Sequence, residues 1–221
     1  MNTKEKIAII GGTGNEGKGL AFRWCRAGYK IIIGSRKLEK AQVAAAEIRN
    51  LVGGDYIIDG KVNTEAASDG DIIIVTVPFH AHREILISIR DYVQGKIVID
   101  VTVPLMPPLI TKVQLPSIGS AAQEAQQLLG SGVYVVSAFQ NISYDLLIKD
   151  QQVDCDVLVC SHSMEAKQKV MQLVSDAGLV GWDAGPLENS CIAEGLTSIL
   201  IGINKQYGIK NAGIKITGVH K

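Results

Sequence analysis

A glycine-rich turn near the N-terminus restricts the fold of this chain more than any other feature. Residues 11–17 read Gly-Gly-Thr-Gly-Asn-Glu-Gly, follow an apolar run at 7–10, and lead into a segment with helical period at 17–26. A strand, a G-x-G-x-x-G turn and a helix form the unit whose exposed N–H groups bind a dinucleotide diphosphate. A purely structural glycine-rich turn is the alternative, but the strand-helix-strand context favours nucleotide binding. The residues expected to bind here are Gly12, Thr13, Gly14, Asn15 and Glu16.

The rest of the chain continues the alternation of strand and helix. Continuous Ile/Val runs at 31–33, 72–77, 97–101 and 133–136 are typical of strands buried on both faces, and helical periods fill 38–51, 82–92 and 120–129. The prediction is an α/β fold, a Rossmann-type doubly wound, mainly parallel sheet.

After residue 137 the pattern changes. A strand at 156–160, a helix at 164–177, a strand at 181–183 and a helix from 187 to about 207 predict a small C-terminal α/β extension. We expect residues 1–137 to form the dinucleotide-binding domain and residues 138–221 a small substrate and dimerisation domain. The last helix carries a broad apolar face, which the rest of the fold or a second subunit must cover: Ile192, Leu196, Ile199, Leu200 and Ile203.

The end of the second strand selects NADP in preference to NAD. A carboxylate about 20 residues after the turn would bind the ribose hydroxyl of NAD, whereas this chain has Gly34-Ser35-Arg36-Lys37. Arg36 can donate two N–H bonds to the extra phosphate of NADP, and Ser35 adds a hydroxyl. Lys40 lies one helical turn further on and projects toward the same place, although an ordinary solvated helix face explains Lys37 and Lys40 equally well.

Composition excludes several classes of partner. The 22 basic and 22 acidic residues give no net charge, so no bulk field attracts nucleic acid or an anionic membrane. The sequence has neither a signal-peptide core nor the roughly 20 apolar residues that span a bilayer, so we expect a cytoplasmic protein. Its four scattered cysteines are expected to be buried small hydrophobes in a reducing compartment, with a reactive or bridging thiol as the alternative.

Ligands of such sheets lie at the carboxyl ends of the strands. Two strands end in Val-Pro there, the first as Thr76-Val77-Pro78-Phe79 and the second at Pro104. These residues predict a rigid apolar wall beside the nicotinamide that excludes water, although both prolines also serve simply to end strands.

No motif for side-chain catalysis or metal binding is present. His80 and His82 lack the carboxylate and cysteine companions that would complete a metal site, and we expect both histidines at the surface or at a pocket rim. We therefore predict no metal, no catalytic side chain, and chemistry supplied by the cofactor.

The sequence resembles the F420H2:NADP oxidoreductase family nearly end to end. The resemblance rests on residues 11–15, 34–36, 120–122 and 136–139, and more specifically on Asp154-Cys155-Asp156-Val157-Leu158-Val159-Cys160 and on Asp183-Ala184-Gly185-Pro186-Leu187-Glu188-Asn189. It implies hydride transfer between NADP(H) and the deazaflavin coenzyme F420, with catalysis by positioning. It also implies a homodimer formed partly through the C-terminal helix.

By the same resemblance, Thr13, Asn15, Ser35, Arg36 and Lys40 hold the phosphates of NADP. Phe79, Pro104 and the segment after Ser137, with Ala138, Gln140 and Tyr144, line the nicotinamide and the deazaflavin.

One stretch departs from the family. Where the family tends to have a histidine and then a proline and an alanine, residues 140–144 read Gln-Asn-Ile-Ser-Tyr, and a bulky Tyr144 reshapes the second pocket. This leaves two further hypotheses open: an NADPH-dependent reductase of another small acceptor (a flavin, an imine or a carbonyl compound), and a non-catalytic NADP-binding regulatory module.

Overall fold

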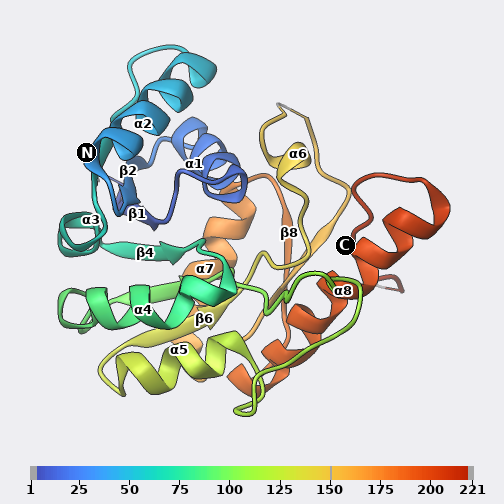
Figure 1. Ribbon diagram of the computed structural model, residues 1–221. Helices are drawn as coiled ribbons and strands as arrows, with labels where there is room; N and C mark the ends of the chain where they lie inside the picture. The colour runs from blue at the N-terminus through green and yellow to red at the C-terminus, as the bar shows by residue number, and fades with distance from the viewer. Residues whose placement is uncertain (1–3, 150, 219–221) are drawn as a thin grey trace.

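A six-stranded parallel sheet forms the centre of the computed structural model, which describes residues 4–149 and 151–218 (Figure 1). The strand order is β3-β2-β1-β4-β5-β6, so the chain winds outward in both directions from β1. This is the doubly wound Rossmann order, as the sequence predicted. The strands are β1 (Lys6–Ile10), β2 (Lys30–Ser35), β3 (Ile58–Val62), β4 (Ile72–Val75), β5 (Ile97–Asp100) and β6 (Tyr134–Ser137).

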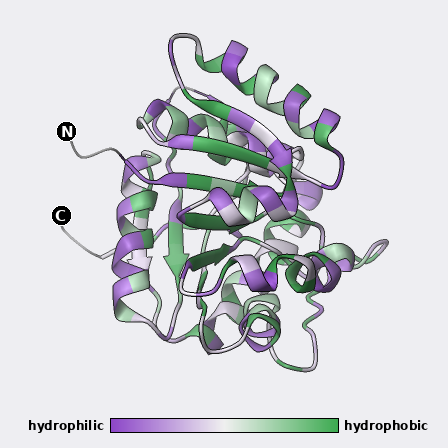
Figure 2. Cartoon of the chain, turned by 90° about the vertical axis from the view of Figure 1, so that its left-hand side faces the viewer, coloured by the Kyte–Doolittle hydropathy of each residue, from purple (hydrophilic) through white to green (hydrophobic). Residues whose placement is uncertain are grey.

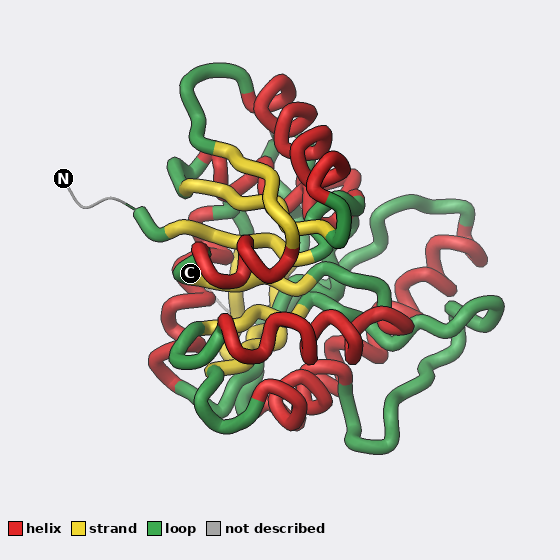
Figure 3. Tube along the Cα trace, turned by 60° about the vertical axis from the view of Figure 1, so that its left-hand side comes forward, coloured by secondary structure: helices red, strands yellow, loops and turns green. Residues whose placement is uncertain are grey.

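Helices cover both faces of this sheet (Figure 3). Because side chains alternate along a strand, Ile7 and Ile9 pack in one apolar cluster and Ala8 and Ile10 in the other. Figure 2 shows the strands as the most hydrophobic part of the chain, with mixed helices outside them. The first cluster contains residues of α1 (Asn15–Arg26), α2 (Leu38–Val52) and α7 (Met164–Asp176), and the second contains residues of α3 (Asn63–Asp69), α4 (Phe79–Ile89) and α5 (Ala121–Leu129).

The C-terminal part adds a small second sheet. Strands β7 (Asp156–Val159) and β8 (Val180–Asp183) pair in parallel, and an antiparallel bridge between Ser137 and Cys160 joins them to the end of β6. The short helix α6 (Tyr144–Leu147) packs on α1, and the long helix α8 (Ser190–Tyr207) follows the 3-10 turn η2 (Leu187–Asn189). Another 3-10 turn, η1 (Arg90–Tyr92), extends α4.

Three elements were not expected from the sequence. The edge strand β3, with sequence IDGKV, has no continuous apolar run, and the short helices α3 and α6 are too brief to show a clear period. The expected helix after Pro186 begins instead as η2, and the α-helix proper starts at Ser190.

The apolar face of α8 is covered only in part. Leu200 is 9% exposed, whereas Ile192 is 63% and Ile199 is 48% exposed. The side that packs on the protein carries the small or polar residues Ala193, Glu194 and Ser198. Within the described ranges, no helix combines the length and the apolar character needed to cross a bilayer.

Candidate active site

The glycine-rich turn lies between the end of β1 and the start of α1. The N–H of Gly12 donates to the carbonyls of Ile9 and Gly34, at 3.1 and 3.0 Å, which ties the turn to β1 and β2. A Cβ on Gly17 would lie 2.6 Å from Cα of Gly12, so only glycine permits this approach of helix and turn. Gly14, which precedes α1, gives the helix no side-chain cap, and the first-turn N–H groups can therefore bind an anion.

A cavity of about 220 Å³ lies beside this turn, at the end of β2. Of the predicted phosphate-binding residues, Thr13, Ser35, Arg36 and Lys40 line it together with Lys37, and no carboxylate does. Three cations and two hydroxyls around one space suit a phosphate group, so the residues present fit NADP. The complete lining is Gly11, Thr13, Ser35, Arg36, Lys37, Lys40, Asn63, Val77, Pro78, Ala81 and Ile85.

Asn63 is a lining residue that the sequence reasoning missed. Its Oδ1 accepts the N–H of Gly11 at 3.4 Å, so it helps to hold the turn. Asn63 begins α3 directly after β3, and both elements lacked a recognisable pattern. Asn63 could have been placed at the carboxyl edge of the sheet if residues 58–62 had been recognised as a strand, because Asn63 directly follows them.

Val77 and Pro78, which were predicted to lie beside the nicotinamide, also line this cavity, whereas the remaining predicted site residues do not. Gly12, Gly14, Asn15 and Glu16 form the turn and the start of α1, and the hydroxyl of Thr76 donates to the carbonyl of Ile10 at 3.1 Å. Phe79 begins α4, Pro104 is buried in the long connection after β5, and the N–H of Ala138 donates to the carbonyl of Asp100 at 3.4 Å. Tyr144 begins α6 and is 39% exposed.

Gln140 is buried and held by its amide nitrogen. Its Nε2 donates to the carbonyl of Asp100 at 2.8 Å and contacts Oγ of Ser137 at 2.9 Å. Its Oε1 is buried without a hydrogen-bond partner, so one acceptor remains for a donor from a bound molecule.

Glu16 carries another buried acceptor without a partner, its Oε1. Burial raises the pKa of this carboxyl from 4.5 to about 8. A neutral carboxylic acid at this point of the turn does not repel a bound diphosphate.

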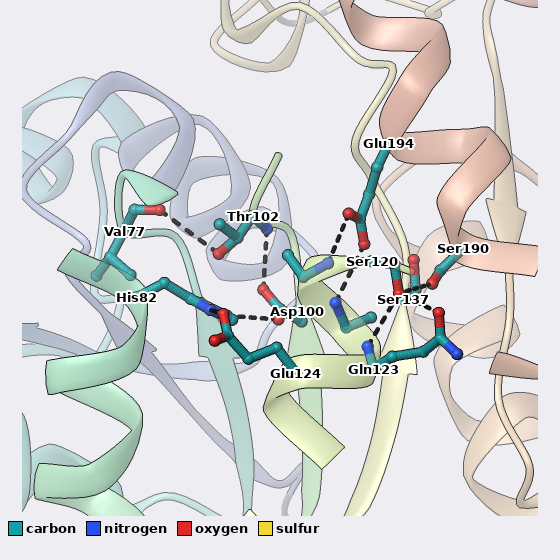
Figure 4. A network of polar contacts seen from close by, with 12 residues as sticks. Val77, His82, Asp100, Thr102, Ser120, Gln123, Glu124, Ser137, Ser190 and Glu194 are labelled. Atoms are coloured by element: carbon teal, nitrogen blue, oxygen red, sulfur yellow. Dashed lines mark hydrogen bonds and ion pairs between the residues drawn. The ribbon is translucent and has the colours of Figure 1, made fainter. Parts of the chain in front are cut away.

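His82 overturns the expectation that both histidines lie at the surface or a rim. His80 is exposed, but His82 is fully buried, and its Nε2 lies 2.7 Å from Oδ2 of Asp100 (Figure 4). Asp100 and Glu124, the second carboxylate near the ring, come from β5 and α5. Sequence proximity could not reveal them, because folding alone brings these three elements together.

A buried carboxylate also joins α8 to α5. Glu194 accepts the N–H groups of Ala121 and Ala122 at 2.7 and 3.1 Å, at the start of α5 (Figure 4). Burial raises the pKa of Glu194 to about 8, although the two N–H donors oppose that shift. Nearby, Oγ of Ser190 donates to Oγ of Ser120 at 2.7 Å. In the part of the chain that the structure describes, no cluster of three His, Cys, Asp or Glu residues could hold a metal ion.

Known proteins resemble this chain in sequence and in fold. Residues 6–104 match the family model described as NADP oxidoreductase, coenzyme F420-dependent. F420-dependent NADP reductases from Methanothermobacter thermautotrophicus and Methanocaldococcus jannaschii are each 40% identical to this chain over 97% of its length. The matched regions cover 95% and 99% of those two proteins, respectively.

A crystal structure described as a putative F420-dependent NADP reductase from Arthrobacter sp. FB24 covers 97% of the chain with a TM-score of 0.80 and 21% identity, which shows the shared fold. The matches to these two reductases extend over nearly the whole length of this chain and of each relative, and the family-model match includes the glycine-rich turn. This chain belongs to the family of coenzyme F420-dependent NADP oxidoreductases.

Proposed function

We propose that this protein transfers a hydride between NADP(H) and the deazaflavin coenzyme F420. The observation that carries the proposal is the 40% identity, over 97% of the chain, to proteins named F420-dependent NADP reductase. The cationic cavity at the end of β2 supports it independently, because Arg36, Lys37 and Lys40 face one space with no carboxylate among them.

The residues of this chain bind and orient two ring systems. Thr13, Ser35, Arg36 and Lys40 hold the phosphates, and the first-turn N–H groups of α1 face the diphosphate. Phe79, Pro104, Ala138, Gln140 and Tyr144 line the nicotinamide and the deazaflavin and exclude water from the hydride path. When bound, NADPH supplies the hydride itself, so the contribution of the protein is the alignment of donor and acceptor.

Spectrophotometry tests this function directly. Catalytic amounts of protein, mixed with NADPH and oxidised F420, should bleach the visible absorbance of the deazaflavin. NADH at the same concentration serves as the control and should react far more slowly. NADPH oxidation with a flavin, an imine or a carbonyl compound but not with F420 would reject F420 as the acceptor. Tight NADPH binding without any turnover would indicate a regulatory module.

Three further proposals concern the whole protein. Residues 1–137 act as the dinucleotide-binding domain and residues 138–221 as the substrate and dimerisation domain. The protein assembles as a homodimer through α8, which the exposed Ile192 and Ile199 support. It works in the cytoplasm, a reducing compartment that suits its free cysteines, Cys25, Cys155, Cys160 and Cys191.

A further inference from the structure

A buried ionic cluster joins α4, β5 and α5, where His82 lies between Asp100 and Glu124 (Figure 4). His82 and Asp100 are both fully buried, and Nε2 of His82 lies 2.7 Å from Oδ2 of Asp100. On the other side of the ring, Nδ1 lies 3.6 Å from Oε2 of Glu124, whose second oxygen accepts a hydrogen bond from Arg83. The proposed binding residues do not include these four.

The surroundings of His82 favour the imidazolium. A carboxylate faces each ring nitrogen, and only the doubly protonated ring presents an N–H to both. Burial by itself lowers the pKa of His82, but the charge and hydrogen bond of Asp100, together with the charge of Glu124, outweigh it and raise that pKa. Glu194 on α8 is the next carboxyl near Asp100 and His82 and adds negative charge only when it is ionised, above its raised pKa, whereas β4 and α3 contribute apolar side chains to this region.

Asp100 connects this cluster to the walls of the proposed active site. Its Oδ1 accepts the N–H of Thr102 at 2.9 Å, and its carbonyl accepts Nε2 of Gln140 at 2.8 Å. Oγ1 of Thr102 lies 3.5 Å from the carbonyl of Val77, which links the ends of β5 and β4. Phe79 stacks directly on the His82 ring, with 6.1 Å between centroids and 29° between planes.

We propose that His82 is a positioning residue for hydride transfer, which acts through Asp100 to hold the ends of β4 and β5, and with them Phe79 and Gln140, around the two reacting rings. This inference rests on the proposed function, because it assigns these walls to the nicotinamide and the deazaflavin. His82 is fully buried, so this role requires no contact between its ring and either cofactor.

If His82 has this role, its substitution should change the rate of hydride transfer but not the affinity for NADP(H). The phosphates are held by Thr13, Ser35 and Arg36, which lie in the cavity at the end of β2 and not in the cluster. A displacement of reacting groups by about 1 Å costs on the order of 100-fold in rate. Loss of the imidazolium should therefore lower kcat and leave the KM for NADPH nearly unchanged.

The test compares the parent protein with His82→Gln in F420 reduction between pH 6 and 10. We expect His82→Gln to lose about 10- to 100-fold in kcat, with the KM for NADPH within about twofold of the parent. Because a raised pKa keeps His82 charged near neutrality, kcat of the parent should fall as the pH rises through that pKa. The part of this fall that His82 causes should be absent from His82→Gln, whose side chain cannot titrate, whereas Glu16 and Glu194, with pKa values raised to about 8, titrate in both proteins.

A second variant keeps the proposal testable if His82→Gln does not fold. Glu124→Gln removes one carboxylate that stabilises the imidazolium, so the fall in kcat should move to lower pH. The matched control is His162→Gln, since His162 also faces a carboxylate, that of Glu188 at 3.5 Å, but is 54% exposed. It should retain the kcat and pH profile of the parent.

An NMR measurement of the ring nitrogens of the four histidines gives a readout besides activity. It should show one ring, absent from His82→Gln, that stays doubly protonated to higher pH than the others. An unchanged kcat and pH profile in both His82→Gln and Glu124→Gln, with an active parent, would overturn the positioning role alone. A parent that does not reduce F420 at all would overturn the proposed function and this role together.

Discussion

Arg36 lies where β2 ends, and its guanidinium lines the same cavity as Ser35 and Lys40. A hydrogen bond to a charged group contributes about 1.5–3 kcal/mol, so Arg36→Ala should weaken NADP binding by about 10- to 100-fold. Binding of NAD should change little, because NAD lacks the phosphate that we propose the guanidinium binds. Calorimetry with both dinucleotides measures the difference.

Arg36→Lys is the matched control for this prediction. Lysine keeps the positive charge but loses the planar fork, so its NADP affinity should lie between those of the parent and Arg36→Ala. Equal or tighter binding of NAD by the parent would contradict the assignment of this cavity to the extra phosphate.

The buried carboxyl of Glu16 should make the free energy of unfolding depend on pH. Its pKa rises from 4.5 to about 8 in the folded chain, so the folded state retains a proton that the unfolded state releases. The stabilisation is complete below the unfolded pKa and is lost as the pH rises through the folded pKa, at about 1.4 kcal/mol per pH unit. Glu16→Gln removes this loss, so it should be a few kcal/mol more stable than the parent at pH 8.5 and equal at pH 4.

Urea denaturation at both pH values measures the effect of Glu16→Gln. Glu39→Gln is the control, because Glu39 also lies in the first turn of a helix, α2, but is exposed. It should not change the pH dependence. If both variants followed the parent at both pH values, the buried carboxyl of Glu16 would not be the cause.

At the level of elements, the contact between α8 and α5 depends on a buried carboxylate. The two carboxyl oxygens of Glu194 accept the N–H groups of Ala121 and Ala122 at the start of α5, at 2.7 and 3.1 Å. Glu194→Ala leaves both donors buried without a partner and opens a cavity, so we expect a loss of about 2–5 kcal/mol in the free energy of unfolding.

Chemical denaturation measures the loss caused by Glu194→Ala. Glu194→Gln should lose less, because it retains one acceptor oxygen. The control is Glu188→Ala, whose carboxylate is 58% exposed and faces His162, and it should cost less than about 0.5 kcal/mol. A similar loss from Glu188→Ala and Glu194→Ala would contradict the role of burial.

The elements also show what a single sequence can reveal. Continuous Ile/Val runs and the glycine turn predicted five strands of the main sheet and the phosphate-binding edge, because those signals are local. The sequence did not indicate β3 and hence Asn63, since this edge strand reads Ile-Asp-Gly-Lys-Val and its charged and glycine residues interrupt any apolar run. The contact of His82 with Asp100 and Glu124 also escaped prediction, because it joins three elements and exists only after packing.

At the scale of the whole molecule, α8 presents an apolar surface that residues 4–149 and 151–218 do not cover. Ile192 and Ile199 are exposed, and together with the half-buried Ile203 they lie on one face, since they are seven and four residues apart on the helix. A groove of about 610 Å³ runs beside them, lined by Thr111, Ile199, Gly202, Ile203, Lys205 and Gln206. Three isoleucines aligned on one face are more than the scattered apolar residues of an ordinary surface.

Sedimentation should therefore show the parent at about twice the chain mass of 23.7 kDa. Ile199→Glu places a charge in the middle of the proposed contact and should convert the dimer to a monomer, because a buried unpaired carboxylate costs several kcal/mol. Ile87→Glu is the matched control: Ile87 is 57% exposed on α4, away from α8, and its variant should remain dimeric. A parent that sediments as a monomer, or an Ile199→Glu variant that remains a dimer, would show that α8 does not form the contact.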